Sequence, residues 1–264
     1  MKRLWVIIAG LLLLISAGRG EHYNMMPSPY AEYERYTYED SLHNRMPYRM
    51  LSPEDIKEGE KYPLVIFLHG SGERGDDNET QLTNGASIFT NPVNLRSYPA
   101  YVVFPQCCDR SWTTKVEPKI FMPGAQVPPE SLAERQVMGI IDNVIKDHPI
   151  DSSRIYILGI SMGGIAVYDL ACRYPERFAA AVPICGAVNP DRLKNTSDIS
   201  FLIFHGAQDE EVPVLCSRKA YVMLDSIGAK VDYVEFAGEG HECWTSAFNY
   251  PTLLPWLFAQ TKKK

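Results

Sequence analysis

The sequence has no excess of positive charge and lacks the phosphate-binding motif of P-loop proteins. Its 264 residues include 26 lysines and arginines against 32 aspartates and glutamates, a formal net charge of −6. Nucleic-acid surfaces depend on clustered basic residues, so we expect no nucleic-acid partner, and acidic polymers are equally poor partners. The pattern GxxxxGK[ST] is absent, which argues against a phosphate-cradling loop of that type.

Six cysteines are present, but no two have the CxxC spacing that is typical of zinc and thioredoxin-like sites. We therefore predict no metal site. An even number of cysteines permits disulfide bonds in an exported chain without requiring them. Cys172 and Cys185 lie in apolar surroundings, where a buried thiol is the simpler interpretation. The first guess for a bond joins the Cys107–Cys108 pair to another loop, and Cys243 is a weaker candidate.

The hydrophobic run at the N-terminus is too short to cross a bilayer. Two basic residues precede an uncharged run over residues 4–17, and small residues follow up to Gly20. A membrane-spanning helix needs roughly 20 residues, so this pattern predicts a cleavable signal peptide over residues 1–20. Its removal takes away three basic residues and changes the net charge from −6 to −9. We expect a secreted or periplasmic protein without stable membrane association.

The remaining chain has the composition of a globular protein, with 45% hydrophobic and 22% charged residues, and residues 21–264 are predicted to form a single domain. Residues 21–45 are polar and rich in tyrosine, and we interpret them as an N-terminal segment with one edge strand. Short apolar runs predict six buried strands, at residues 63–68, 101–104, 155–158, 179–182, 201–204 and 231–236. Helical patterns lie between and after them, at residues 129–147, 162–174, 214–228 and 253–258.

Strands that alternate with helices of ten or more residues indicate parallel β-α-β units. The predicted fold class is therefore α/β, a doubly wound, mostly parallel sheet with helices on both faces. No insertion between the last two predicted strands is long enough for a large lid. In such sheets the reactive site lies beyond the carboxyl ends of the strands, so chemically active side chains are expected there.

Ser161 lies in the sequence Gly159-Ile160-Ser161-Met162-Gly163, between a predicted strand and a predicted helix. G-x-S-x-G in this context indicates a nucleophile elbow, a tight turn that exposes the serine hydroxyl above the sheet. The alternative is a glycine-rich turn that only joins strand to helix. The start of the following helix would also direct N–H groups toward a developing oxyanion.

A serine hydroxyl needs a base to accept its proton. Of the six histidines, His241 follows the last predicted strand and lies in a glycine-rich loop, from which it could reach inward. His69 and His205 each end a strand and precede glycine, so we interpret them as structural residues. His241 is therefore the predicted base.

The acid is expected between serine and histidine in the chain. Asp209 follows the fifth predicted strand, and the neighbouring Glu210 and Glu211 are alternatives that depend on how the loop turns. The order serine, aspartate, histidine is that of α/β-hydrolases and differs from the orders of chymotrypsin-like and subtilisin-like enzymes.

An oxyanion hole needs two backbone donors. The residue after the nucleophile, Met162, supplies one, and the loop after the first predicted strand supplies the other. That loop reads His69-Gly70-Ser71-Gly72, so the second donor is Ser71, with Gly72 as the alternative.

The sequence resembles the α/β-hydrolase superfamily, in particular exported bacterial esterases grouped with feruloyl esterases, polyhydroxybutyrate-depolymerase-like enzymes and prolyl oligopeptidase-like hydrolases. The resemblance runs from about Tyr48 to the C-terminus. Its most specific mark is LHGSGERGDDN at residues 68–78. Further marks are Tyr48-Arg49, Tyr62-Pro63-Leu64-Val65, Pro105-Gln106-Cys107 followed by Trp112, GISMGG from Gly159, HGAQDEEVP from His205 and GEGH from Gly238.

The resemblance implies a hydrolase that cleaves esters through an acyl-enzyme, with a triad of Ser161, His241 and Asp209 and no cofactor. It also implies, together with export, that the substrate is a small ester or an esterified oligosaccharide, such as plant polysaccharide carrying feruloyl or acetyl groups. Alternatives with the same chemistry are a peptidase, a thioesterase or a lysophospholipase. An inactive hydrolase fold that serves as a binding module is the alternative from another class.

Four further residues are candidates for contact with substrate. Glu73 and Arg74 follow the oxyanion loop and either grip a polar group or form an internal ion pair that stiffens the loop. Trp112 and Trp244 either form a stacking wall for a sugar or phenolic acid or pack at the rim.

Overall fold

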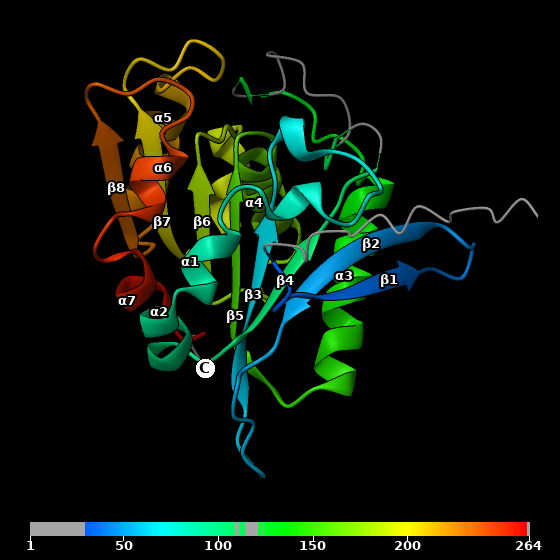
Figure 1. Cartoon of the computed structure of the whole chain (residues 1–264). Coiled ribbons are helices and arrows are strands. Elements are labelled where there is room, and N and C mark those ends of the chain that lie inside the picture. Colours follow the sequence, from blue (N-terminus) through cyan, green and yellow to red (C-terminus); the bar gives the residue numbers. More distant parts are fainter. Residues whose placement is uncertain (1–29, 109–110, 114–120, 123, 263–264) are drawn as a thin grey trace, which may run out of the picture.

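The computed structural model describes residues 30–108, 111–113, 121–122 and 124–262, so the predicted signal peptide lies outside the described residues. In the described part, one sheet contains eight strands in the order β1-β2-β4-β3-β5-β6-β7-β8 (Figure 1). The strands are β1 (Glu34–Glu39), β2 (Arg45–Leu51), β3 (Tyr62–Leu68), β4 (Tyr101–Pro105), β5 (Ile150–Ile160), β6 (Ala180–Ile184), β7 (Ser200–Gly206) and β8 (Val231–Phe236).

The sheet is parallel from β4 to β8 and antiparallel where β2 pairs with β1 and β4. This confirms the predicted mostly parallel sheet. The α-helices are α1 (Ala86–Thr90), α2 (Pro92–Ser97), α3 (Leu132–Asp147), α4 (Met162–Arg173), α5 (Leu215–Ser226), α6 (Trp244–Phe248) and α7 (Leu253–Phe258). Short 3-10 helices are η1 (Ser71–Glu73), η2 (Thr80–Leu82) and η4 (Pro190–Asn195). None of the described helices is long and apolar enough to cross a membrane.

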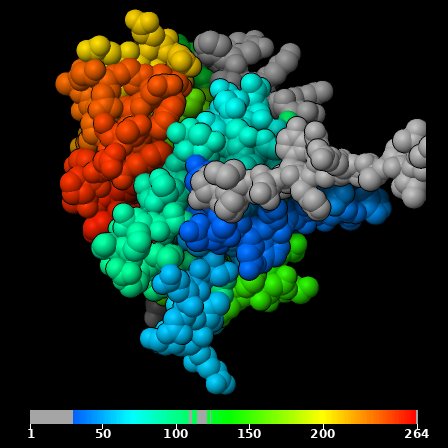
Figure 2. Space-filling model, viewed as in Figure 1, coloured from blue at the N-terminus to red at the C-terminus, as the bar shows by residue number. Residues whose placement is uncertain are grey.

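The core has two layers because alternate residues of the central strands point to opposite faces. In β3, Leu64 and Ile66 pack in the layer covered by α3, α4 and α5, whereas Val65 and Phe67 pack in the layer covered by α1, α6 and α7. On the second face the C-terminal helices lie beside α1 and α2, and the ring of Tyr98 at the end of α2 stacks on Phe258 (Figures 1 and 2).

The N-terminal part differs from the prediction. We expected one edge strand within residues 21–45, but β1 and β2 form an antiparallel hairpin, and β2 continues to Leu51 and pairs with β4. The clustered tyrosines pack against this sheet edge and its helices: Tyr33 is buried and donates to the carbonyl of Ala86, and Tyr36 stacks on Tyr48. β1 is the expected edge strand, and β2 was missed because polar and apolar residues are mixed along it.

A pair of buried carboxyl groups joins α3 to α4. Glu134 is part of the capping box that starts α3, where its side chain accepts from the N–H of Ser131. Asp169 lies on α4 and forms ion pairs with Arg173 and Arg192. Burial and the adjacent Asp169 raise the pKa of Glu134 to about 9. Glu134 is therefore protonated in the folded protein at neutral pH and can donate to the Asp169 carboxylate.

Because the pKa of Glu134 is raised on folding, its contribution to stability is complete below its usual value of 4.5 and is lost as the pH rises toward about 9. Glu134→Gln keeps a neutral donor and acceptor at every pH. We expect the melting temperature of the variant, relative to the parent, to rise by roughly 5 °C between pH 5 and pH 9. Differential scanning calorimetry at both pH values tests this, with the exposed Glu58→Gln as control. A difference in melting temperature between variant and parent that does not change with pH would contradict this prediction.

Candidate active site

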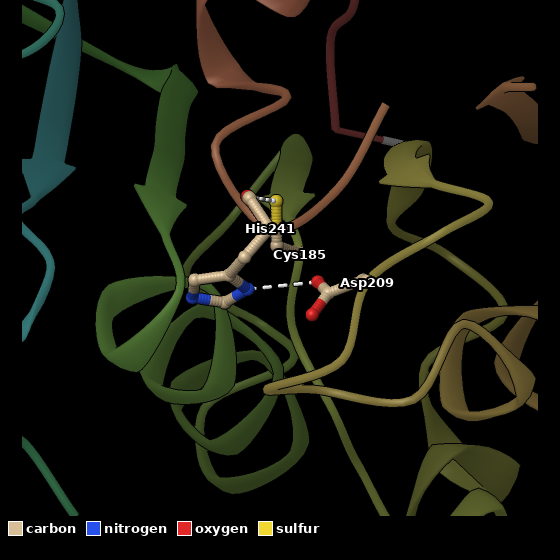
Figure 3. Close-up of side chains that lie close together, drawn as sticks. All are labelled: Cys185, Asp209 and His241. Carbon is tan, nitrogen blue, oxygen red and sulfur yellow. Dashed lines mark hydrogen bonds and ion pairs between the residues drawn. The ribbon is translucent and has the colours of Figure 1, made fainter. Parts of the chain in front are cut away.

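The predicted nucleophile, acid and base lie beyond the carboxyl ends of three parallel strands. Ser161 follows β5, Asp209 follows β7 and His241 follows β8. Neighbouring parallel strands end at the same edge of a sheet, so residues far apart in the sequence meet there. Figure 3 shows the His241 ring facing Asp209, with the Cys185 sulfur from the end of β6 next to the main chain of the histidine.

Ser161 adopts a backbone conformation that is rare for a residue with a side chain, with φ 52° and ψ −116°. Its N–H donates to the carbonyl of Ile184 at the end of β6, at 2.9 Å. The following turn passes so close to β3 that a Cβ atom on Gly163 would lie 2.0 Å from the carbonyl oxygen of Leu68. Only glycine is compatible with this approach. The structure therefore has the strained strand-to-helix turn that the G-x-S-x-G pattern predicts.

The three side chains form a continuous chain of hydrogen bonds. His241 Nδ1 lies 2.8 Å from Asp209 Oδ2, and His241 Nε2 lies 2.7 Å from Ser161 Oγ. A carboxylate only accepts hydrogen bonds, so Nδ1 carries the proton and Nε2 is the acceptor for the serine hydroxyl. The imidazole therefore has the tautomer that is needed to accept a proton from Ser161.

Asp209 is buried and its carboxylate is fully engaged. Oδ1 accepts from the backbone N–H groups of Glu211 and Val212, at 2.9 and 2.8 Å. The two alternative acids do not occupy this position. Glu210 is exposed, and the carboxylate of Glu211 is 74% exposed and lies 3.7 Å from His241 Nε2, on the opposite side of the ring from Nδ1.

A second histidine contacts the same carboxylate. His205 Nε2 lies 3.1 Å from Asp209 Oδ2 and 2.9 Å from the carbonyl oxygen of Val212. Because both neighbours are acceptors, Nε2 carries the proton, and Nδ1 accepts from the hydroxyl of Ser217 at 2.7 Å. Burial lowers the pKa of His205, so the ring is neutral. We predicted only a structural role for His205, because the sequence does not show that the loop folds back to bring Asp209 against it.

The loop after β3 lies against the nucleophile turn. A Cβ atom on Gly70 would lie 3.5 Å from the side chain of Ile160, and Ser71 begins η1, where it is exposed. Met162 is the first residue of α4, so its N–H has no partner within the helix. The predicted oxyanion donors thus belong to two segments in contact.

His69 anchors this loop from inside the protein. Its Nε2 accepts from the N–H of Cys107 at 3.0 Å, so its Nδ1 donates to the carbonyl of Gly70 at 2.6 Å. Burial lowers the pKa of His69 to about 4, which keeps the ring neutral. The loop also has the spacing Gly70-x-Gly72-x-x-Gly75, but η1 has only three residues. The longer helix that follows this motif in dinucleotide-binding proteins is therefore missing here.

Glu73 and Arg74 make contacts within the same loop. Glu73 accepts from the side-chain amide of Asn84 at 2.7 Å, and its backbone carbonyl accepts from Gln106 at 3.3 Å. Arg74 is exposed and donates to the carbonyl of Ser71 at 2.7 Å. These bonds stiffen the loop that holds the predicted oxyanion donor.

The two tryptophans have different positions. Trp112 is fully buried, donates to the carbonyl of His69 at 2.9 Å and packs against the ring of that histidine. The prediction that Trp112 offers a stacking face to a substrate is therefore wrong in this structure, because its indole completes the core beneath the loop. Trp244 is half-buried at the start of α6, and its ring meets His241 edge to face at 5.7 Å. It remains a candidate for substrate contact.

Cys185, Asp209 and His241 bring three potential metal-ligating atoms within 4.8 Å of one another (Figure 3). These atoms already have partners within the protein. Asp209 Oδ2 accepts from His241 Nδ1, and Cys185 Sγ donates to the backbone carbonyl of His241 at 2.9 Å. The arrangement is therefore that of a hydrogen-bonded acid and base, and the sulfur contacts the main chain of the base.

The chain is similar to known esterases and depolymerases in sequence and fold. A poly(3-hydroxyalkanoate) depolymerase C of Paucimonas lemoignei is 33% identical over 126 residues, 47% of this chain and 28% of the relative. A probable feruloyl esterase C of Aspergillus terreus is 25% identical over 171 residues, 65% of this chain and 57% of the relative. The crystal structure of a thermostable esterase has a TM-score of 0.81 at 33% identity and covers 88% of this chain and 64% of that one.

The chain thus spans between 28% and 64% of the length of these relatives. The family described as Phospholipase/Carboxylesterase matches residues 55–250, which include Ser161, Asp209 and His241 with the strands that carry them. Because this match covers most of the chain and the sheet is mostly parallel with helices on both faces, the protein belongs to the phospholipase/carboxylesterase family of α/β-hydrolases.

Proposed function

We propose that this protein is a serine carboxylic-ester hydrolase that works through an acyl-enzyme. The observation that carries the proposal is the unbroken contact from Ser161 Oγ to His241 Nε2, at 2.7 Å, and from His241 Nδ1 to Asp209 Oδ2, at 2.8 Å. These are the separations and the order of groups that nucleophilic catalysis by serine requires.

In the proposed reaction, His241 accepts the proton of Ser161 as the hydroxyl oxygen attacks the ester carbonyl. The positive charge that develops on the imidazole is stabilised by Asp209, which also holds the ring in its reactive tautomer. The backbone N–H groups of Met162 and Ser71 stabilise the oxyanion. His241 then protonates the departing alcohol, and water, activated by the same histidine, hydrolyses the acyl-enzyme and restores Ser161.

For the substrate we propose an esterified oligosaccharide that carries feruloyl or acetyl groups. The likeness to a probable feruloyl esterase supports an aromatic acyl group, and the half-buried ring of Trp244 beside His241 offers it an apolar face. The depolymerase relative supports a polyester as a second candidate. We also propose that residues 1–20 direct export and are removed, which places the enzyme outside the cytoplasm with its polymeric substrate.

Ser161→Ala should abolish ester hydrolysis. Without the hydroxyl no acyl-enzyme forms, and losses of about 10⁴- to 10⁶-fold in kcat are typical of such a change. Hydrolysis of p-nitrophenyl acetate by the purified protein measures it, and the exposed Ser97→Ala on α2 is the matched control. An unchanged rate of p-nitrophenyl acetate hydrolysis in the Ser161 variant would contradict the proposal.

His205 is proposed as a positioning residue for Asp209. His205→Phe removes its N–H from the carboxylate, and we expect kcat to fall by about 10- to 100-fold with little change in KM, because the His241 ring is less well oriented. Loss of this hydrogen bond also destabilises the ionised carboxylate, so the acid limb of the kcat/KM profile should move to higher pH. His205→Gln retains a donor and should recover most of the activity. Equal losses in both variants, with no shift in pH profile, would indicate a purely structural role.

A panel of substrates tests the chemical class. Methyl ferulate, acetylated xylan, poly(3-hydroxybutyrate) and a chromogenic peptide are compared at equal enzyme concentration, with the Ser161→Ala variant as the blank. We expect the highest kcat/KM on methyl ferulate or on acetylated xylan. Faster cleavage of the peptide than of every ester would overturn the assignment as an esterase, and faster cleavage of the polyester would replace the proposed substrate.

A further inference from the structure

Two buried cysteines lie side by side directly behind the predicted base. Cys185 follows the end of β6, Cys243 follows His241 by two residues, and both side chains are fully buried. Their sulfur atoms are 3.0 Å apart, although 58 residues separate them in the chain. A disulfide bond has a length of about 2.04 Å, so the sulfurs need to approach by about 1 Å.

We propose that Cys185 and Cys243 form a disulfide bond that ties the loop of His241 to the end of β6. The proposal differs from our first guess from the sequence, which favoured Cys107 and Cys108, and from the interpretation of Cys185 as a simple buried thiol. Neither the pairing nor its relation to His241 can be predicted from spacing, because the two cysteines meet only when β6 and the loop after β8 are both in place.

The bond would connect the two halves of the active site. Ile184, the neighbour of Cys185, accepts the hydrogen bond from the N–H of Ser161 at 2.9 Å, so the end of β6 already supports the nucleophile. On the other side, Cys185 Sγ lies 2.9 Å from the backbone carbonyl of His241. A covalent link at this point would restrain the distance between the base and the turn that carries the nucleophile.

The local backbone is arranged to hold the cysteine in this orientation. Cys185 has a φ of 49°, in the left-handed region that residues with side chains rarely adopt. Its N–H donates to the carbonyl of Phe204 on β7 at 2.9 Å. The neighbouring Gly186 packs against Gly164, in the first turn of α4. Strained conformations of this kind persist where the surrounding structure determines them.

Formation of this bond needs an oxidant, and we propose a disulfide compound, such as oxidised glutathione or an oxidised protein dithiol. The two cysteine thiols lose two electrons and two protons and form one S–S bond, while the oxidant disulfide is reduced to two thiols. The hydrogen bond with Cys243 and burial raise the pKa of Cys185 in the folded protein. Reactive thiolate is therefore scarce after folding, and the bond should form during folding in an oxidising compartment.

The test uses the full chain carrying Ser161→Ala as well as the parent, both produced in an oxidising bacterial compartment. Thiols are alkylated under denaturing conditions without reductant, and the protein is digested and analysed by mass spectrometry. We expect peptides containing Cys185 and Cys243 to be joined in both proteins, and to separate after reduction. Because Ser161→Ala has no nucleophile, this readout does not depend on the proposed function. Alkylation of both cysteines as thiols would overturn the proposal.

Cysteine variants distinguish the effect of the disulfide bond from that of the surrounding side-chain packing. Cys243→Ser should lose the joined peptide and melt roughly 5–10 °C below the parent from the oxidising compartment, while Cys216→Ser on α5 should retain it. Parent protein made under reducing conditions should melt at the temperature of Cys243→Ser and show a lower kcat with a similar KM. A joined peptide that persists in Cys243→Ser would assign Cys185 to another partner and reject the pairing. If this variant does not fold, the peptide map of the parent still decides.

Discussion

The site depends on the close approach of two backbone segments at the turn after β5. Gly163 lies so near the end of β3 that a Cβ atom would be 2.0 Å from the carbonyl oxygen of Leu68. This contact presses the start of α4 against the sheet and forces Ser161 into a conformation that costs of order 1–3 kcal/mol. The parallel pairing of β5 with β3 and β6 fixes the strand before the turn and so holds the turn in this conformation. Ser161 is half-buried, and it keeps this conformation because the paired strands leave the turn no relaxed alternative.

Around this turn, several buried polar groups are joined by hydrogen bonds. Asp209 accepts from two backbone N–H groups, from His241 and from His205, while His69 and Trp112 fasten the loop after β3 from within the core. A buried group without a partner is costly, so each of these contacts restricts the others to one arrangement. The base is thereby held in one tautomer and one orientation before any substrate binds.

Much of the fold could be predicted because its signals are local. Burial requires apolar residues at every position that faces the core. This requirement produces the continuous apolar runs of β3 and β7 and the helical spacing of apolar residues in α3. The antiparallel strand β2, which lies between β1 and β4, was missed because polar and apolar residues are mixed along it. The sequence left Trp112 open between a stacking wall for substrate and packing at the rim, because an aromatic residue after a strand end looks the same in either place. Only the packing shows that Trp112 is buried.

The sequence by itself determined which chemical groups are available and in what order: a serine between glycines after one strand, an aspartate after a later one and a histidine after the last. Those patterns are local or follow chain order, so they can be recognised in the sequence alone. Only the tertiary structure decided that His205 contacts Asp209 and that Cys185 lies against Cys243. Such contacts join segments that come from different strands, and their geometry depends on sheet register and loop path, which no spacing along the chain records.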